Sequence, residues 1–112
     1  IEFNDVSKAK VVCSKSGRLM YVSRAGIPVT NKGNFHSAER AIWLFAFNKI
    51  NLDNYFNCGD SKIEIIEESD IIRFLELDIP VFCVDLIGDS WAVDEMKDIQ
   101  IVEKLMNQQN RN

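Results

Sequence analysis

Two side chains, Cys58 and His36, are of the types that perform nucleophilic catalysis. Cys58 lies in a polar segment beside Asp60, and His36 is the single histidine of the chain. A cysteine becomes a strong nucleophile when a base lies within hydrogen-bond reach, and His36 is the candidate base. The two residues are far apart in the sequence, so the fold would have to bring them together. A small enzyme that uses Cys58 and His36 is therefore one alternative.

Asp85 is a carboxylate inside the most apolar stretch of the chain. The surrounding residues 80–87 read as a central strand that is covered on both faces. The carboxyl ends of such strands are where α/β folds place ligand-facing groups. Neither a glycine-rich phosphate loop nor a Walker motif accompanies Asp85. An enzyme that acts through Asp85 is a second form of the same alternative.

The three cysteines do not indicate a metal site. Cys13, Cys58 and Cys83 lack the short spacing of zinc ligands, and one histidine cannot complete a tetrahedral set. An odd number of scattered thiols favours a reducing compartment, so we expect a cytoplasmic protein. The leading prediction assigns no catalytic residue, no metal and no cofactor.

Charge is divided unevenly between the two halves of the chain. Residues 1–50 carry eight Lys and Arg against three Asp and Glu, whereas residues 51–112 carry five against fourteen. The second half therefore has a net charge of −9, which attracts a basic partner and repels nucleic acid or an anionic membrane. No stretch approaches the roughly 20 apolar residues of a membrane span.

The acidic half also contains an aromatic residue suited to partner binding. Trp91 lies in a polar segment where it has no evident core role, and a tryptophan that enters a partner's pocket anchors an interface. Acidic residues around it would steer the encounter. The expected partner-binding surface consists of Glu64, Glu67, Glu68, Asp70, Asp85, Asp89, Trp91 and Asp94.

These features favour a protein-binding module rather than an enzyme. The specific prediction is an immunity or antitoxin-type inhibitor of a nuclease toxin, because nucleases must be basic to hold phosphates. A phage-encoded inhibitor or nucleic-acid mimic, acting on a host nucleic-acid-binding protein, would use the same electrostatics. A further alternative is an assembly subunit that forms a homo-oligomer through an aromatic helix over Ala38–Ile50.

The elements that position these residues follow from the hydrophobic pattern. Strands over residues 8–15 and 18–23, joined through Ser16-Gly17, predict a hairpin. The apolar residues of 38–50 surround the whole helical wheel, which predicts a helix buried on nearly all sides or one that offers an aromatic face to a partner.

Strands and helices are expected to alternate in the second half. A loop over 51–61 precedes strands at 62–66 and 80–87, which flank a short helix at 69–77, and a last helix spans 94–107. The strand–helix–strand passage implies a parallel pair of strands beside the antiparallel hairpin.

The whole chain is predicted to form one domain. Its 112 residues, 46% of them hydrophobic, suffice for a single core. The predicted fold class is α/β or α+β, in two layers, with a mixed sheet of about four strands and about three helices in the order β-β-α-β-α-β-α. Residues 107–112 should form a frayed polar tail.

Overall fold

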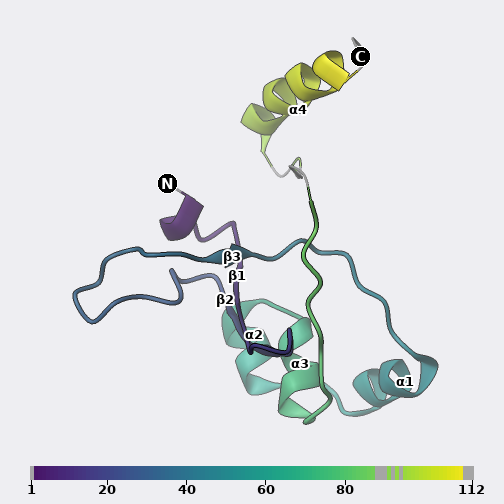
Figure 1. Ribbon diagram of the computed structural model, residues 1–112. Helices are drawn as coiled ribbons and strands as arrows, with labels where there is room; N and C mark the ends of the chain where they lie inside the picture. The colour runs from purple at the N-terminus through teal and green to yellow at the C-terminus, as the bar shows by residue number, and fades with distance from the viewer. Residues whose placement is uncertain (1, 88–90, 92, 94, 110–112) are drawn as a thin grey trace.

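The computed structural model describes residues 2–87, 91, 93 and 95–109. In this part of the chain a short 3-10 helix (Glu2–Asn4) is followed by three strands and then by four α-helices (Figure 1). This mixture confirms the predicted α/β class. The elements are β1 (Lys10–Cys13), β2 (Leu19–Ser23), β3 (Glu39–Arg40), α1 (Lys49–Asn57), α2 (Lys62–Glu67), α3 (Ile71–Glu76) and α4 (Met96–Gln109).

The strands form an antiparallel sheet in the order β2-β1-β3. The predicted hairpin of β1 and β2 is confirmed, with Val11 opposite Val22. Its turn contains Gly17 at φ +79°, a left-handed conformation that glycine adopts at low cost. On the other edge β1 pairs with the two residues of β3, with Lys10 opposite Arg40.

The buried core lies between the sheet and α3. Val22 of β2 and Ile72 of α3 have exposed fractions of 0% and 1%, and Leu19 and Phe74 are also buried beside them. Burying such an aliphatic or aromatic side chain is worth about 1.5–3 kcal/mol. Packing of α3 on β2 therefore holds the helical part of the chain against the sheet.

The predicted helix over residues 38–50 is wrong, because residues 41–48 form no helix and α1 begins only at Lys49. Trp43, Phe45 and Phe47 alternate along this segment, and successive rings lie 5.8 Å apart between centroids. That period of two is the side-chain repeat of a strand. Apolar residues all around a helical wheel fit equally well a strand that is apolar on both faces, and periodicity alone cannot separate the two.

Helix α1 occupies most of the segment predicted as a loop over 51–61. It begins after Asn48, whose side-chain oxygen accepts a hydrogen bond from the amide of Asn51 at 2.8 Å. Asparagine favours this capping position because its short side chain satisfies a free amide of the first turn. The loop prediction gave weight to the polar composition and overlooked the cap.

The segment predicted as a strand over 62–66 is helix α2. Ser61 and Glu64 form a capping box: the Ser61 hydroxyl accepts from the Glu64 amide at 3.2 Å, and the Glu64 carboxylate accepts from the Ser61 amide at 3.3 Å. This reciprocal pair starts a helix even where isoleucines favour a strand. Helix α2 ends at Glu67 and is followed by the C-cap residue Glu68, which adopts φ 49°.

The predicted strand over 80–87 is wrong, because these residues form no regular strand and contact the sheet only near Phe82. Arg18 forms an isolated antiparallel bridge with Phe82, and the amide of Cys83 donates to the Gly17 carbonyl at 2.8 Å. In Figure 1 the segment runs alone from α3 toward α4. The predicted parallel pair is therefore absent from the described residues, because α2 replaces the strand that would have formed it.

The two remaining helices lie near their predicted places. Helix α3 begins after Asp70 and lies within the predicted 69–77, although Ser69 does not cap it and its hydroxyl is buried without a hydrogen-bond partner. Helix α4 starts two residues later than expected, and an Asp98 oxygen accepts from the Glu95 amide at 2.9 Å. Within the described ranges, no helix combines the length and the apolar character that crossing a membrane requires.

Candidate functional site

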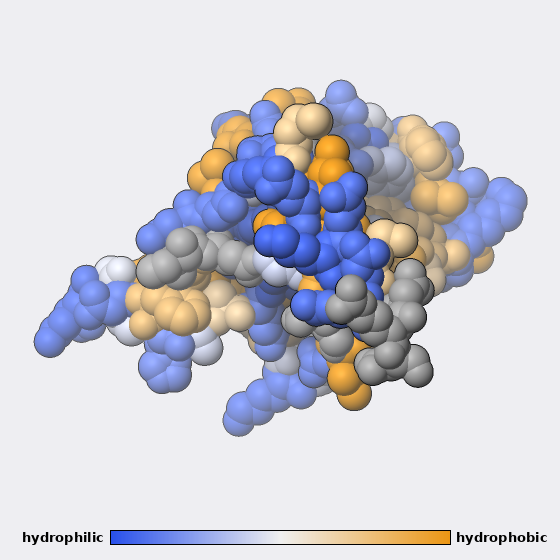
Figure 2. All heavy atoms as spheres, turned by 90° about the horizontal axis from the view of Figure 1, so that it is seen from above, coloured by the Kyte–Doolittle hydropathy of each residue, from blue (hydrophilic) through white to orange (hydrophobic). Residues whose placement is uncertain are grey.

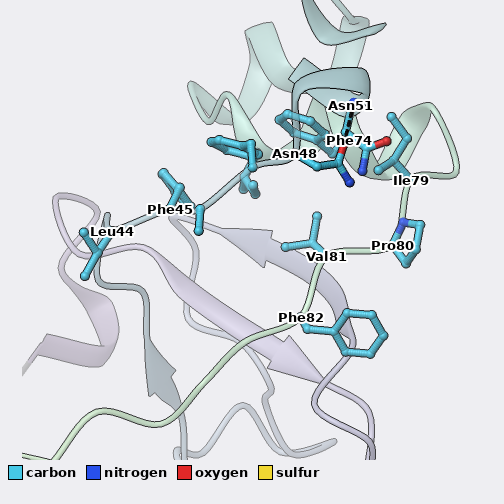
Figure 3. A pocket seen from close by; sticks show the side chains of 12 residues that line it. Leu44, Phe45, Asn48, Asn51, Phe74, Ile79, Pro80, Val81 and Phe82 are labelled. Atoms are coloured by element: carbon cyan, nitrogen blue, oxygen red, sulfur yellow. Dashed lines mark hydrogen bonds between the residues drawn. The ribbon is translucent and has the colours of Figure 1, made fainter. Parts of the chain in front are cut away.

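A pocket lies between two extended segments, residues 44–48 and 79–82, with side chains of α3 at its base (Figure 3). Its volume is about 300 Å³. Phe45 and Val81 come from the two different segments, and Phe74 of α3 joins them. The pocket thus depends on three parts of the chain that are distant in the sequence.

The side chains that line the pocket are apolar apart from two asparagines, but backbone groups make more than half of its surface polar. Asn48 and Asn51 contribute amide groups, and the Asn48 oxygen is already engaged as the cap of α1 (Figure 3). None of the described residues that line the pocket carries an ionisable side chain. The described lining side chains therefore provide neither an acid, a base nor a nucleophile.

An aromatic stack leads from this pocket into the helical part of the chain. Phe47 stacks on Phe74 with centroids 4.9 Å apart, and Phe74 stacks on Tyr55 at 5.0 Å. The Arg73 guanidinium lies 4.0 Å from the centroid of the Tyr55 ring. Such ring pairs and a cation over a ring each add to burial, so the stack fixes α1 against α3.

Arg73 is the centre of a buried ion cluster. Its guanidinium donates to both carboxylate oxygens of Glu64, at 2.5 and 2.6 Å, and to Asp60 at 2.9 Å. A fourth bond goes to the Tyr55 carbonyl at 3.3 Å. The Arg73 bonds hold the pKa of Glu64 below its ordinary value. Glu64, predicted as a partner-binding residue, is buried and is committed to this cluster.

Glu67, a second predicted binding residue, also serves an internal contact. Its carboxylate accepts from the Tyr21 hydroxyl at 3.0 Å, from the Ser23 hydroxyl at 2.9 Å and from the Arg24 amide at 3.2 Å. These bonds tie the end of α2 to β2. Burial and the neighbouring Glu67 raise the pKa of Tyr21. Glu67 is therefore a structural link rather than a free charge.

The other predicted binding residues are dispersed. Glu68, Asp70 and Asp85 are exposed, and Glu68 lies 3.9 Å from Arg24 in a weak surface ion pair. Trp91 is 39% exposed. Asp89 and Asp94 lie outside the described residues. The predicted partner-binding residues therefore do not form one surface. Glu64 and Glu67 make internal contacts, whereas the exposed acids lie on separate segments.

The candidate nucleophile and base are each engaged locally. The Cys58 thiol donates to the Tyr55 carbonyl at 3.2 Å, while His36 contacts the neighbouring Ser37 hydroxyl at 3.3 Å. Burial and a contact with Cys83 raise the pKa of Cys13 to about 12, so this thiol is protonated at neutral pH. In the part of the chain that the structure describes, no group of three or more His, Cys, Asp or Glu residues could hold a metal ion.

Two basic residues of the first half are also structural. The Lys10 amine donates to the carbonyls of Asp5, Lys8 and Arg24 at 2.6–2.9 Å, and burial lowers its pKa. Arg24 donates to the carbonyls of Val6, Glu67 and Glu68. These bonds hold the base of the hairpin together.

The fold of this chain is similar to that of a solved enzyme structure. It matches the solved structure of CMP:2-keto-3-deoxy-manno-octonic acid synthetase complexed with CTP, with a TM-score of 0.85 and 23% identity. The match covers 96% of this chain and 45% of that protein. The shared fold is the nucleotidyltransferase α/β fold. No family model matches the chain.

Sequence similarity leads to a particular group of proteins, the 3-deoxy-manno-octulosonate cytidylyltransferases. The proteins of that name from Lawsonia intracellularis, Acidobacterium capsulatum and Koribacter versatilis are 33%, 30% and 29% identical to this chain, over 102, 106 and 103 residues. These matches cover 90%, 94% and 90% of the chain, but only 40%, 43% and 39% of the relatives. The chain therefore spans about two fifths of the length of the curated relatives it matches.

These similarities overturn the prediction of a non-catalytic immunity or antitoxin-type inhibitor. The relatives and the structural neighbour are enzymes, and none is described as a toxin inhibitor. The basic protein partner, inferred from the net charge of −9, is contradicted for the same reason. The physical error was to count every acid as a free charge. Glu64 pairs with the Arg73 cation, and the Glu67 carboxylate accepts hydrogen bonds from hydroxyl groups of β2.

The sequence analysis predicted neither the pocket nor the course of residues 44–48 beside it. One signal could have revealed them: Trp43, Phe45 and Phe47 alternate with Leu44 and Ala46, which is a strand pattern that is apolar on both faces.

Proposed function

We propose that this chain forms part of a cytidylyltransferase that transfers CMP from CTP to a 3-deoxy-ulosonic sugar acid and releases pyrophosphate. The observation that carries the proposal is the joint similarity of sequence and fold to such enzymes. It extends over 90% of the chain by sequence and 96% by structure, rather than over one short motif. The acceptor that the relatives' names support best is 3-deoxy-manno-octulosonate. A cytoplasmic location belongs to the same proposal, because the CTP donor is a cytoplasmic metabolite.

We do not place either substrate in the pocket beside α3. Both substrates are anionic, since CTP carries a triphosphate and the acceptor a carboxylate. Enzymes that transfer phosphoryl groups surround the reacting phosphates with cations and hydrogen-bond donors. The described lining of the pocket offers only apolar side chains and two asparagines. The groups that bind the phosphates would therefore lie elsewhere in the complete enzyme.

The experiment uses a chimera, because the chain spans only part of its relatives. This chain replaces the matched 102-residue segment of the Lawsonia intracellularis protein. The purified chimera is incubated with CTP, as its magnesium salt, and with 3-deoxy-manno-octulosonate. We expect pyrophosphate release that requires both substrates and exceeds, at least about tenfold, the rate with ATP, GTP or UTP.

The matched control is the same host protein with the segment deleted, which should release no pyrophosphate. A folded chimera that produces no pyrophosphate with this acceptor, or that uses all nucleotides equally, would contradict the proposed function.

A further inference from the structure

Two of the three cysteines lie against each other, although they are far apart in the sequence. Cys13 is the last residue of β1, and Cys83 follows 70 positions later. Their thiols are close enough to share a hydrogen bond, and both side chains are half-buried against the core. Cys58, by contrast, is exposed and donates to the Tyr55 carbonyl. The fold therefore brings together one particular pair of thiols.

The backbone positions this pair from both sides. Cys13 lies opposite Leu19 in the hairpin, and the Leu19 amide donates to the Val81 carbonyl at 2.8 Å. The Cys83 amide donates to the Gly17 carbonyl, also at 2.8 Å. Side chains that lie opposite each other across strands, or two positions apart along one, share a face of the sheet. Cys13, Val81 and Cys83 are thus all placed on the face that packs against the core.

The close approach of the two parts of the chain depends on Gly17. This residue adopts φ +79°, and a Cβ at its position would lie 3.3 Å from the carbonyl oxygen of Cys83. Most side chains do not tolerate so short a separation, and the left-handed conformation also favours glycine. The hairpin turn and residue 83 are therefore held in contact by hydrogen bonds and packing, without a covalent link.

We propose that Cys13 and Cys83 form a reversible redox modification site, at which hydrogen peroxide links the two thiols as a disulfide. The two sulfurs of a disulfide are about 2.05 Å apart, so thiols that already share a hydrogen bond need only a small movement to meet. Disulfides that form in a reducing compartment are mostly transient and serve redox sensing or catalysis. The site does not depend on the proposed function.

The surroundings of the pair favour a small, uncharged oxidant. Burial, the contact with Cys83 and the carboxylates of Glu39 and Asp85 all raise the pKa of Cys13. The same carboxylates repel oxidised glutathione, which is anionic and bulky, whereas hydrogen peroxide is small and neutral. Because Cys13 stays protonated at neutral pH, Cys83 is the thiol that reacts first.

One molecule of peroxide completes the reaction. The Cys83 sulfur attacks one peroxide oxygen, the O–O bond breaks, and a sulfenic acid and one water form. The Cys13 sulfur then displaces the hydroxyl group from Cys83, so that the S–O bond breaks and the S–S bond forms. The Cys13 proton leaves with this hydroxyl as a second water. The two sulfurs lose two electrons to the peroxide, and a dithiol such as dithiothreitol returns them.

The experiment identifies which cysteines become linked. The three cysteines fall in different tryptic peptides, residues 11–15, 50–62 and 74–97. The reduced chain is treated with equimolar hydrogen peroxide, alkylated in urea to trap the remaining thiols, and digested without reduction for mass spectrometry. We expect the Cys13–Cys83 link to exceed each link to Cys58 at least about tenfold, because its thiols already lie in contact. Oxidised glutathione should form this link at least about tenfold more slowly.

The unfolded chain provides the reference for this selectivity. Cys58 and Cys83 are 25 positions apart, against 70 for Cys13 and Cys83, and closing a shorter loop costs less entropy. The same treatment in concentrated urea should therefore favour the Cys58–Cys83 link. In the folded chain Cys58→Ser is the matched control, since it removes an exposed thiol and should change the yield of the Cys13–Cys83 link by less than about twofold.

A second measurement follows the effect of the link on stability. In the Cys58→Ser variant, the oxidised chain should unfold at a urea concentration at least about 0.5 M higher than the reduced chain, because the link restricts the unfolded state. Dithiothreitol should restore the midpoint of the reduced chain. Adding Cys13→Ser should abolish the shift caused by peroxide.

Several results would overturn the site. One is a folded chain that links Cys83 to Cys58 as often as to Cys13, or that carries separate sulfinic acids at positions 13 and 83. Another is a peroxide-dependent dimer on a non-reducing gel, which would place the link between two chains. A lower unfolding midpoint after oxidation would mean that the thiols must be displaced to meet. Faster linkage by oxidised glutathione than by peroxide would contradict peroxide as the oxidant.

Discussion

At the scale of single residues, Arg73 connects more helices of this fold than any other side chain described above. It is buried, it bonds to Glu64 and Asp60, and it covers the Tyr55 ring. Through these contacts one side chain joins α1, α2 and α3. The Arg73 guanidinium is paired with the carboxylates of Glu64 and Asp60, so we interpret the cluster as structural.

Removal of Arg73 should therefore destabilise the fold strongly. We expect Arg73→Ala to cost about 3–5 kcal/mol, because Glu64 would remain buried without its counter-charge. The control is Lys49→Ala, which breaks the exposed ion pair with Asp53 and should cost about 0.5 kcal/mol or less. Urea unfolding followed by tryptophan fluorescence measures both. Similar losses for the two variants would contradict a buried cluster.

Glu64 should make stability depend on acid. Its pKa is lower in the folded state than the ordinary 4.5, so its contribution is fully present above that value. As pH falls through the folded-state pKa, the carboxylate protonates and the contribution is lost. The free energy by which Glu64→Gln is less stable than the parent should thus shrink below about pH 4.5. Unfolding curves from pH 7 to pH 3 test this, and a constant difference would refute it.

The acidic residues also show how far the sequence allowed the candidate site to be predicted. Net charge can be counted from the sequence, but the fold decides which charges are exposed. Glu67 lies in an acidic run, yet it accepts bonds from Tyr21 and Ser23 in a strand more than forty positions earlier. No local pattern announces such a contact.

At the scale of elements, local signals decided which predictions succeeded. The hairpin was predictable because Gly17 marks its turn, and α4 because its apolar residues follow one helical stripe. Residues 41–47 were mistaken for a helix because their two apolar faces mimic a buried helix. The pocket could not be predicted, since it requires this segment, residues 79–82 and α3 to converge.

The capping box explains why the isoleucine-rich residues 62–67 form α2. Ser61→Ala should remove one of its two bonds and destabilise the fold by about 1 kcal/mol. Ser37→Ala, at an exposed position in an irregular segment, should change stability by less than about 0.5 kcal/mol. Chemical denaturation compares the two, and equal effects would mean that the cap does not stabilise α2.

At the scale of the whole molecule, the main feature is the number of large hydrophobic side chains that are exposed. Leu44 and Val84 are 77% and 81% exposed, and Ile87 is fully exposed. Figure 2 shows apolar side chains reaching the surface at several places on one face of the molecule. We name the following set the apolar band: Trp43, Leu44, Phe45, Phe47, Phe82, Val84, Leu86 and Ile87.

The apolar band should make the isolated chain bind hydrophobic dyes and associate at high concentration. We expect Leu44→Lys with Val84→Lys to lower the fluorescence of bound anilinonaphthalene sulfonate severalfold. Their stability should stay within about 0.5 kcal/mol of the parent, because both side chains are exposed.

The control for this prediction is Ile50→Lys with Ile66→Lys, which places equal charge outside the apolar band. A similar loss of dye fluorescence in that variant would mean that the band has no special hydrophobic character. That residues 1–112 form one self-standing two-layer domain stays a prediction, and the same measurements bear on it.

The double role of Glu64 has a consequence for natural variation. Its carboxylate both completes the start of α2 and neutralises Arg73. Glutamine would keep the helix start but leave a buried cation unpaired, whereas aspartate is too short to do both. Position 64 should therefore be among the least substitutable in this chain, and a change there should survive only when position 73 changes in the same lineage. Covariation of positions 64 and 73 among related sequences would then reveal this contact without a structure.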